Sequence, residues 1–195
     1  MQSATAMPRS SVHRERLLQT AIRLFRQRGF AATGLAEILA GSGAPRGSLY
    51  HYFPGGKAQL GAEAVEMAGA AVTATLEGLR SRTAGADAFA EAYVALLVRS
   101  VEASGFRDGC PIATVLLETA ADEPAIATAG RRAFEAWCAV IASVYERDGV
   151  ERQQAAERAM QFVALVEGAL LLARVQGSAE PLRRIARGAS AAALA

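Results

Sequence analysis

The segment 33–53 reads TGLAEILAGSGAPRGSLYHYF, and it decides the fold of the N-terminal part of the chain. Its apolar residues recur at helical spacing over 34–40 and again after the Gly41-Ser42-Gly43 tripeptide. Glycines at such a point let two helices turn and cross closely. Thr33 suits the cap of the first short helix, and Pro45 suits the first position of the second. The segment therefore predicts a helix-turn-helix.

Helical spacing also recurs outside this segment, whereas no run of alternating apolar and polar residues predicts a strand. One helix is expected before the segment, ending at Gly29, and the helices expected after it lie at about 57–79, 89–101, 112–120, 124–149, 152–175 and 181–189. We therefore predict an all-α chain of about nine helices. Its expected parts are a flexible N-terminal arm (1–11), a helix-turn-helix domain (12–56) and a helical body (57–195).

The composition narrows the class of protein. The chain has 195 residues, of which 52% are hydrophobic and 21% charged, and this excludes a disordered tail or a small disulfide scaffold. Its two cysteines, Cys110 and Cys138, fit a reducing cytosol. The most apolar stretch, 162–175, contains Glu167 and Arg174 and is shorter than the roughly 20 residues of a membrane span. We therefore expect a soluble cytoplasmic protein without a membrane segment.

Charge is divided unevenly along the chain. Residues 1–60 hold eight lysines and arginines against two acids, whereas residues 61–195 hold more acids than bases, so the overall charge of +2 hides a basic N-terminal part. A basic module favours contact with a polyanion, although solvated helix faces explain the same charges. The arginines that we expect on such solvated faces are Arg14, Arg23, Arg26 and Arg28.

The start of the second short helix carries residue types that read DNA. Small and polar side chains at this position of a helix-turn-helix can enter the major groove. Arg46 can pair with O6 and N7 of guanine, and Ser48 can bond a base edge or a phosphate. Ala44 and Pro45 can touch a thymine methyl group. The segment therefore predicts double-stranded DNA as a partner.

Two stretches of the chain resemble a known protein family. The residues Gly29–Ala40, followed by Gly43–Phe53, are similar in type and spacing to the DNA-binding signature of the TetR/AcrR family of bacterial transcriptional regulators. This resemblance runs from about Arg14 to Leu60. The shorter stretch Gly109-Cys110-Pro111-Ile112-Ala113 resembles the LmrA/YxaF-like subgroup.

The resemblance implies a role for each matching residue. Thr33 would bond a backbone phosphate, and Tyr50 and His51 would contact phosphates as well. Lys57 would do so from the start of the following helix, although Pro54-Gly55-Gly56 places it about one position later than in many members. The residues that would meet bases are Arg46, Gly47 and Ser48, with Ala44 and Pro45 beside them. Taken alone, Tyr50 also reads as a core aromatic and His51 as an exposed helix residue.

The helical body shows no pattern of catalytic residues. Both histidines, His13 and His51, lie in the N-terminal part, so no Ser-His-acid or Cys-His arrangement is expected in the body. No metal-ligand cluster and no phosphate-binding glycine loop is recognisable, and no cofactor is expected. An enzyme using Glu118 and Tyr93, and an interaction adaptor with a vestigial helix-turn-helix, remain the alternatives to a DNA-binding regulator.

The body contains many large apolar residues, which could line a ligand cavity or fill a core. The resemblance favours a cavity that takes a small, largely apolar effector. Glu118 could be its acid or a helix-face residue, Cys110 a thiol sensor or a small buried hydrophobe, and Trp137 a cavity wall or core. The expected pocket residues are Met67, Phe89, Tyr93, Leu97, Phe106, Cys110, Leu116, Glu118, Trp137, Ile141, Phe162 and Val166.

The predicted helix 152–175 is apolar almost all round in its second half, so we expect it to be buried on two sides. One side would face the body and the other a second subunit. The resemblance implies a homodimer whose recognition helices lie about 34–36 Å apart, as successive major grooves of a palindrome require. The expected function is repression of transcription that ends when the effector moves the helix beginning near Lys57.

Overall fold

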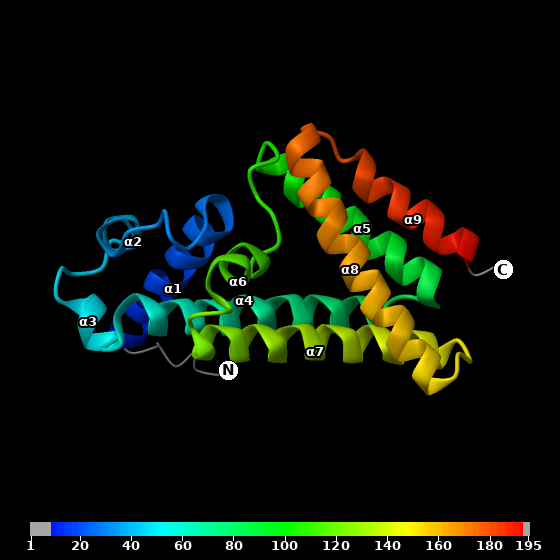
Figure 1. Ribbon diagram of the computed structural model, residues 1–195, viewed down its shortest axis with the longest axis horizontal. Coiled ribbons are helices and arrows are strands. Elements are labelled where there is room, and N and C mark those ends of the chain that lie inside the picture. The colour runs from blue at the N-terminus through cyan, green and yellow to red at the C-terminus, as the bar shows by residue number, and fades with distance from the viewer. Residues whose placement is uncertain (1–8, 193–195) are drawn as a thin grey trace, which may run out of the picture.

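The computed structural model describes residues 9–192, and every regular element within them is an α-helix (Figure 1). The helices are α1 (Arg9–Arg28), α2 (Leu35–Ser42), α3 (Ser48–Tyr52), α4 (Gly56–Arg80), α5 (Ala86–Ala103), α6 (Ala113–Thr119), α7 (Pro124–Arg147), α8 (Arg152–Gln176) and α9 (Glu180–Ala192). The all-α fold class predicted from the sequence is confirmed. Helix α1 begins inside the expected N-terminal arm, and residues 1–8 of that arm lie outside the described residues.

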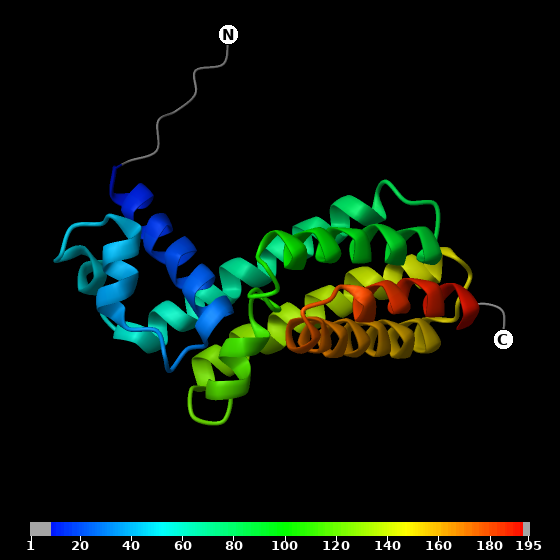
Figure 2. The ribbon, with the colours of Figure 1, turned by 90° about the horizontal axis from the view of Figure 1, so that it is seen from above.

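The helices form an elongated molecule with a small module at one end and a larger bundle at the other (Figure 2). Helices α1–α3 make the module, and α4 runs from it into the bundle alongside α7 (Figure 1). Helix α8 packs against α7, and α9 packs against α5 and α8. The short helix α6 contacts α1, so the bundle touches the module through α6 as well as through α4.

Local sequence explains the helix-turn-helix. Gly43 ends α2 with φ 64°, a left-handed conformation that glycine adopts without a steric penalty. Ile38 of α2 and Leu49 of α3 are fully or almost fully buried, and they join Phe25 of α1 and Phe53 in one core. The two short helices are therefore held at a fixed angle by shared apolar contacts.

Two details of this module differ from the sequence expectations. The N-cap of α2 is Gly34, which has an extended backbone conformation. Thr33 was expected there, but its hydroxyl group donates a hydrogen bond to the Gly29 carbonyl. Helix α3 begins at Ser48, because Pro45 occupies a turn whose carbonyl accepts a hydrogen bond from the Ser48 amide at 2.9 Å. The start of α3 is therefore three residues later than the proline suggested.

Helix α8 has two faces of unequal burial. Phe162, Val166 and Leu170 are buried against the bundle, whereas Leu165 and Val175 are 59% and 78% exposed. By length and composition alone, α8 is apolar enough to cross a membrane, and 33% of its most apolar 18-residue window is buried. Helix α8 therefore meets the length and composition criterion for a membrane span despite the charges of Glu167 and Arg174. Its exposed apolar face is not covered by any other helix of the described chain.

Candidate functional site

The segment from Ala44 to His51 lies at the outer end of the small module (Figure 1). Pro45, Arg46 and Gly47 are exposed, and the Tyr50 side chain is 65% exposed although it is aromatic. Exposure of these groups on a rigid helix pair is the geometry that a groove-reading element needs. The exposed Tyr50 rules out its reading as a core aromatic in this structure.

Ser48 and Ala44 are less available than their exposed neighbours. The Ser48 hydroxyl donates a hydrogen bond of 2.6 Å to the Pro45 carbonyl, which closes the turn before α3. Ala44 is half-buried and packs against the core. For either side chain to contact DNA, it must therefore share or give up its present contact inside the module.

Thr33 is placed differently from the expectation. Its side chain is fully buried, and its single hydroxyl hydrogen is donated to the Gly29 carbonyl at 2.8 Å. A hydroxyl that has given its hydrogen to a carbonyl cannot donate it to a phosphate oxygen as well. The expected phosphate contact of Thr33 is therefore incompatible with this geometry, and the residue secures the turn between α1 and α2.

Lys57, in the first turn of α4, points back to the same turn. Its Nζ lies 4.5 Å from the centroid of the Phe30 ring and donates to the Ala31 carbonyl at 3.4 Å. Burial lowers the pKa of the ammonium group, and the nearby Glu118 carboxylate acts in the opposite direction. The charge expected to meet phosphate is thus held at the joint between module and bundle.

Glu118 forms the first of two polar joints between the bundle and the module. From α6 its carboxylate accepts a hydrogen bond of 2.6 Å from the Ala31 amide. A Cβ atom at Gly29, where φ is +88°, would collide with this carboxylate. Glu118 is exposed and does not line the interior of the bundle. Its expected role as a pocket acid is therefore wrong, because α6 turns that side chain outward toward the α1–α3 module.

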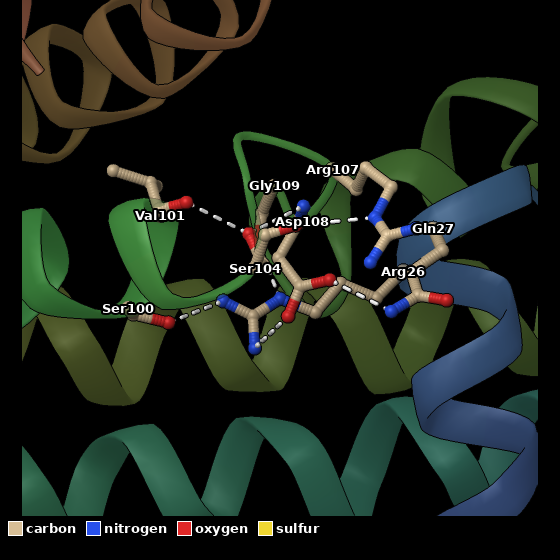
Figure 3. A network of polar contacts seen from close by, with 8 residues as sticks. All are labelled: Arg26, Gln27, Ser100, Val101, Ser104, Arg107, Asp108 and Gly109. Atoms are coloured by element: carbon tan, nitrogen blue, oxygen red, sulfur yellow. Dashed lines mark hydrogen bonds and ion pairs between the residues drawn. The ribbon is translucent and has the colours of Figure 1, made fainter. Parts of the chain in front are cut away.

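Arg26 forms the second joint, which Figure 3 shows from close by. Its Nε donates to the Gly109 carbonyl at 2.6 Å, and one Nη donates to the Ser100 hydroxyl at 3.1 Å. The other Nη lies 3.3 Å from the Asp108 carboxylate, which also accepts a 3.1 Å hydrogen bond from the Gln27 side chain. Arg26 of α1 is thus tied to α5 and to the loop before α6, and its expected position on a solvated face is wrong.

Other arginines of α1 also have partners. Arg14 pairs with Glu63 of α4 and lies over the Phe53 ring, at 5.5 Å from the ring centroid. Arg28 pairs with Glu37 of α2. These pairs are more exposed than the Arg26 joint, so each contributes little to stability.

The interior of the bundle contains a cavity of about 10 Å³, which holds on the order of one water molecule. A second hollow beside Phe89 has no room for water. In this conformation neither of these two hollows among the described residues has room for an organic ligand. Residues lining the cavity are Leu76, Tyr93, Trp137, Ile141, Phe162, Val163, Val166 and Glu167.

Five of the expected pocket residues line that cavity, and the others lie elsewhere. Phe89 borders the second hollow, and Cys110 is buried without lining either hollow. Leu116 of α6 packs over Gly130 of α7, where a Cβ atom would collide with it. Met67, Leu97 and Phe106 are half-buried and pack against the core without lining the cavity.

Glu167 is the acid of the cavity, and the sequence analysis did not select it. The Cys110 thiol lies beside its carboxylate, and burial raises the pKa of its carboxyl group. Burial also raises the pKa of the Tyr93 hydroxyl and, together with the Glu167 charge, that of Cys110. The signal available in the sequence was an acid in the middle of an apolar helix.

A groove of about 520 Å³ lies between α8 and α9 on the outside of the bundle. Its lining is mostly small or apolar, and consists of Ala164, Leu165, Gly168, Ala169, Leu172, Gln176, Glu180, Pro181, Arg184 and Ile185. Further exposed apolar residues on the same face of α8 are Met160, Leu171 and Val175. A contiguous exposed apolar surface of this kind marks an interaction site.

Two family models match the chain, one for each part of the structure. Residues 17–64 match bacterial regulatory proteins of the tetR family, and residues 85–188 match the C-terminal domain of LmrA/YxaF-like transcriptional regulators. The first match extends into α4, and the second begins at residue 85, after α4 has ended.

Relatives match over almost the whole chain. An uncharacterized HTH-type transcriptional regulator of Mycobacterium tuberculosis is 39% identical over 180 residues, which cover 89% of this chain and 90% of that protein. The HTH-type transcriptional regulator LmrA of Bacillus subtilis is 33% identical over 178 residues, covering 88% and 92% of the two chains. YxaF of Bacillus subtilis is 31% identical over 173 residues, covering 89% and 91%.

Solved structures share the fold. A TetR regulatory protein from Rhodobacter sphaeroides superposes with a TM-score of 0.82 at 22% identity, covering 91% of this chain and 97% of that one. Reduced NemR of E. coli gives a TM-score of 0.77 at 26% identity, covering 91% and 95%. The helix-turn-helix, the bundle and the matches together show that this chain belongs to the TetR family of bacterial regulatory proteins and is a transcriptional regulator with an LmrA/YxaF-like C-terminal domain.

Proposed function

We propose that the protein is a homodimeric, cytoplasmic repressor that binds a palindromic DNA operator and leaves it when a small effector enters the bundle. The observation that carries this proposal is the exposed start of α3 on a module that the bundle holds through two polar joints. Helix α1 of the module is attached to the bundle through these joints, and α4 continues from the module into the bundle. A movement of the bundle would therefore reorient the module.

The proposed DNA contacts follow from exposure. Arg46 is the residue that reads guanine, and Pro45 and Gly47 approach the bases beside it. Tyr50 and His51 are exposed and would contact phosphates. Further contacts by Ala44, Ser48 and Lys57 would require these side chains to change their present partners. Thr33 is no longer part of the proposal.

The groove between α8 and α9 is the proposed dimer interface. Its exposed leucines and its small residues would be covered by the same helices of a second subunit, which gives a two-fold interface. A second copy also explains why an apolar face of α8 is uncovered here. The proposed dimer would bring two copies of α3 to one side of a DNA duplex, as a palindromic site requires.

The proposed route from cavity to DNA is short. Glu167 at the cavity lies beside Cys110, and the preceding residue, Gly109, accepts a hydrogen bond from Arg26. An effector that displaces Glu167 would therefore move the loop that holds α1. A hundredfold loss of operator affinity needs about 2.7 kcal/mol of differential effector binding between the two arrangements.

Binding of the protein to the DNA upstream of its own reading frame tests the proposed function. Fluorescence anisotropy should show tighter binding to that DNA than to a random duplex of equal length, with an affinity that falls steeply as salt is raised. Equal binding to both duplexes at every salt concentration would reject the proposal. Sedimentation in the absence of DNA should show a dimer, and a monomer at micromolar concentration would reject the proposed interface.

A further inference from the structure

The polar corner of the cavity lacks hydrogen-bond donors. The neighbouring group of Glu167 is the Cys110 thiol, which is a weak donor, whereas a carboxylate can accept about four hydrogen bonds. The Tyr93 hydroxyl lines the same cavity, and among the described residues it has no hydrogen-bond partner. Among the described residues the one fully buried side-chain polar atom without a partner is His13 Nδ1, so the Tyr93 hydroxyl is not sealed from solvent, and a ligand that brings donors can replace water at this corner.

The corner also lacks a positive charge. Among the described residues, none forms an ion pair with Glu167. Arg174, two turns further along α8, lies over Gly109 instead. Helices α4 and α7 present only uncharged groups to the cavity, among them Leu76 and Ile141. A half-buried carboxylate without a cationic partner is costly, and a bound cation would relieve that cost.

The walls next to the carboxylate are aromatic. The Tyr93 and Phe162 rings lie with their centroids 6.4 Å apart and their planes tilted by 46°, and Trp137 also lines the cavity. The Trp137 indole donates its N–H to the Gly69 carbonyl at 3.0 Å, so the ring offers its surface and not its donor. Aromatic faces beside a carboxylate favour a cation that carries apolar groups.

We propose that the effector is an amphiphilic organic cation, whose charged nitrogen lies against Glu167 and whose apolar part lies between Tyr93, Phe162 and Trp137. This inference rests on the proposed effector cavity and specifies the class of its ligand. An anion would meet the Glu167 charge, and a neutral hydrocarbon would leave the polar corner unsatisfied.

The size of the cavity makes ligand entry a mechanical event. About 10 Å³ cannot hold such a cation, so the rings of α5 and α8 must separate when it binds. The cation competes with the Cys110 thiol for Glu167, which frees the segment whose Gly109 carbonyl holds Arg26. Charge recognition and displacement of the joint would thus occur at the same residue.

Three probes of similar shape test the ligand class: phenethylammonium, which carries three N–H donors, its neutral isostere propylbenzene, and the anion 3-phenylpropanoate. Trp137 is the one tryptophan of the chain and lines the cavity, so its fluorescence reports binding to the full-length protein without DNA. We expect the cation to bind at least about tenfold more tightly than the neutral isostere, and the anion to bind more weakly than both. This comparison within the unaltered protein needs no variant.

The Glu167→Gln variant should abolish the preference for the cation, since it keeps the shape of the side chain and removes the charge. Glu157→Gln, at an exposed position of the same helix, should keep it. The inference is overturned if the cation fails to quench Trp137, if the isostere binds equally well, or if the preference survives Glu167→Gln. Operator binding is measured separately: a cation that binds without weakening it would leave the ligand class standing and reject the proposed release mechanism.

Discussion

Replacement of Arg26 by alanine should weaken the joint between the DNA-binding module and the bundle. The change removes hydrogen bonds to Gly109 and Ser100 and the ion pair with Asp108. Loss of one partner of a fully buried pair costs about 3–5 kcal/mol. Here the two charged side chains are 24% and 18% exposed, so water screens the pair. We therefore expect the free energy of unfolding to fall by about 2 kcal/mol, and the Tm by about 4–8 °C.

Thermal and urea unfolding at one fixed protein concentration would measure this loss, since the stability of a dimer depends on concentration. Arg16→Ala is the matched control, because Arg16 is exposed on the same helix. A double-mutant cycle with Asp108→Asn isolates the pair, for which we expect a coupling of about 1 kcal/mol. If Arg26→Ala costs no more than Arg16→Ala, to within about 0.5 kcal/mol, the joint does not hold the two parts together.

The same variant separates a joint from a DNA contact. Because Arg26 donates to groups of the protein, its loss should change operator affinity without changing how steeply that affinity falls with salt. A slope reduced by about one would instead show that Arg26 neutralises a phosphate, and the assignment to the joint would be refuted.

Four further perturbations follow from individual residues. Arg46→Ala should weaken operator binding by about 1–3 kcal/mol and relax sequence preference, which anisotropy with operator and random duplexes would detect; unchanged discrimination would exclude base reading. Gly29→Ala should lower the Tm, since the new Cβ meets the Glu118 carboxylate at a left-handed φ of +88°; an unchanged Tm would contradict that contact. Leu172→Asp should convert the dimer to monomers in sedimentation, because it places a charge in the α8–α9 groove; a persisting dimer would place the interface elsewhere. Burial raises the pKa of Glu167 above 4.5, so the folded chain keeps a proton that the unfolded chain has lost, and stability should fall as the pH rises through the folded pKa. Glu167→Gln should remove that fall in urea unfolding, and an identical pH profile would show that this carboxyl group is not buried.

The sequence by itself determined the fold class and the position of the helix-turn-helix. The signals of the helix-turn-helix lie within some twenty residues, and each acts locally: apolar spacing sets two helices, and Gly43 adopts the turn conformation that ends the first. The family signature falls on the same residues, so the resemblance and the physical pattern agreed. The exposure of Arg46 and Tyr50 follows from the same local geometry.

Only the tertiary structure decided which polar residues serve the cavity and which serve the joints. Glu118 and Glu167 each stand in an apolar helix, and a sequence pattern records spacing along a helix but not the rotation of that helix toward its neighbours. Packing turns Glu118 toward Ala31 and Glu167 toward Cys110. For the same reason Arg26 could not be told from its solvated neighbours, because its partners lie more than seventy residues away in sequence and meet it only when α5 and α1 come together.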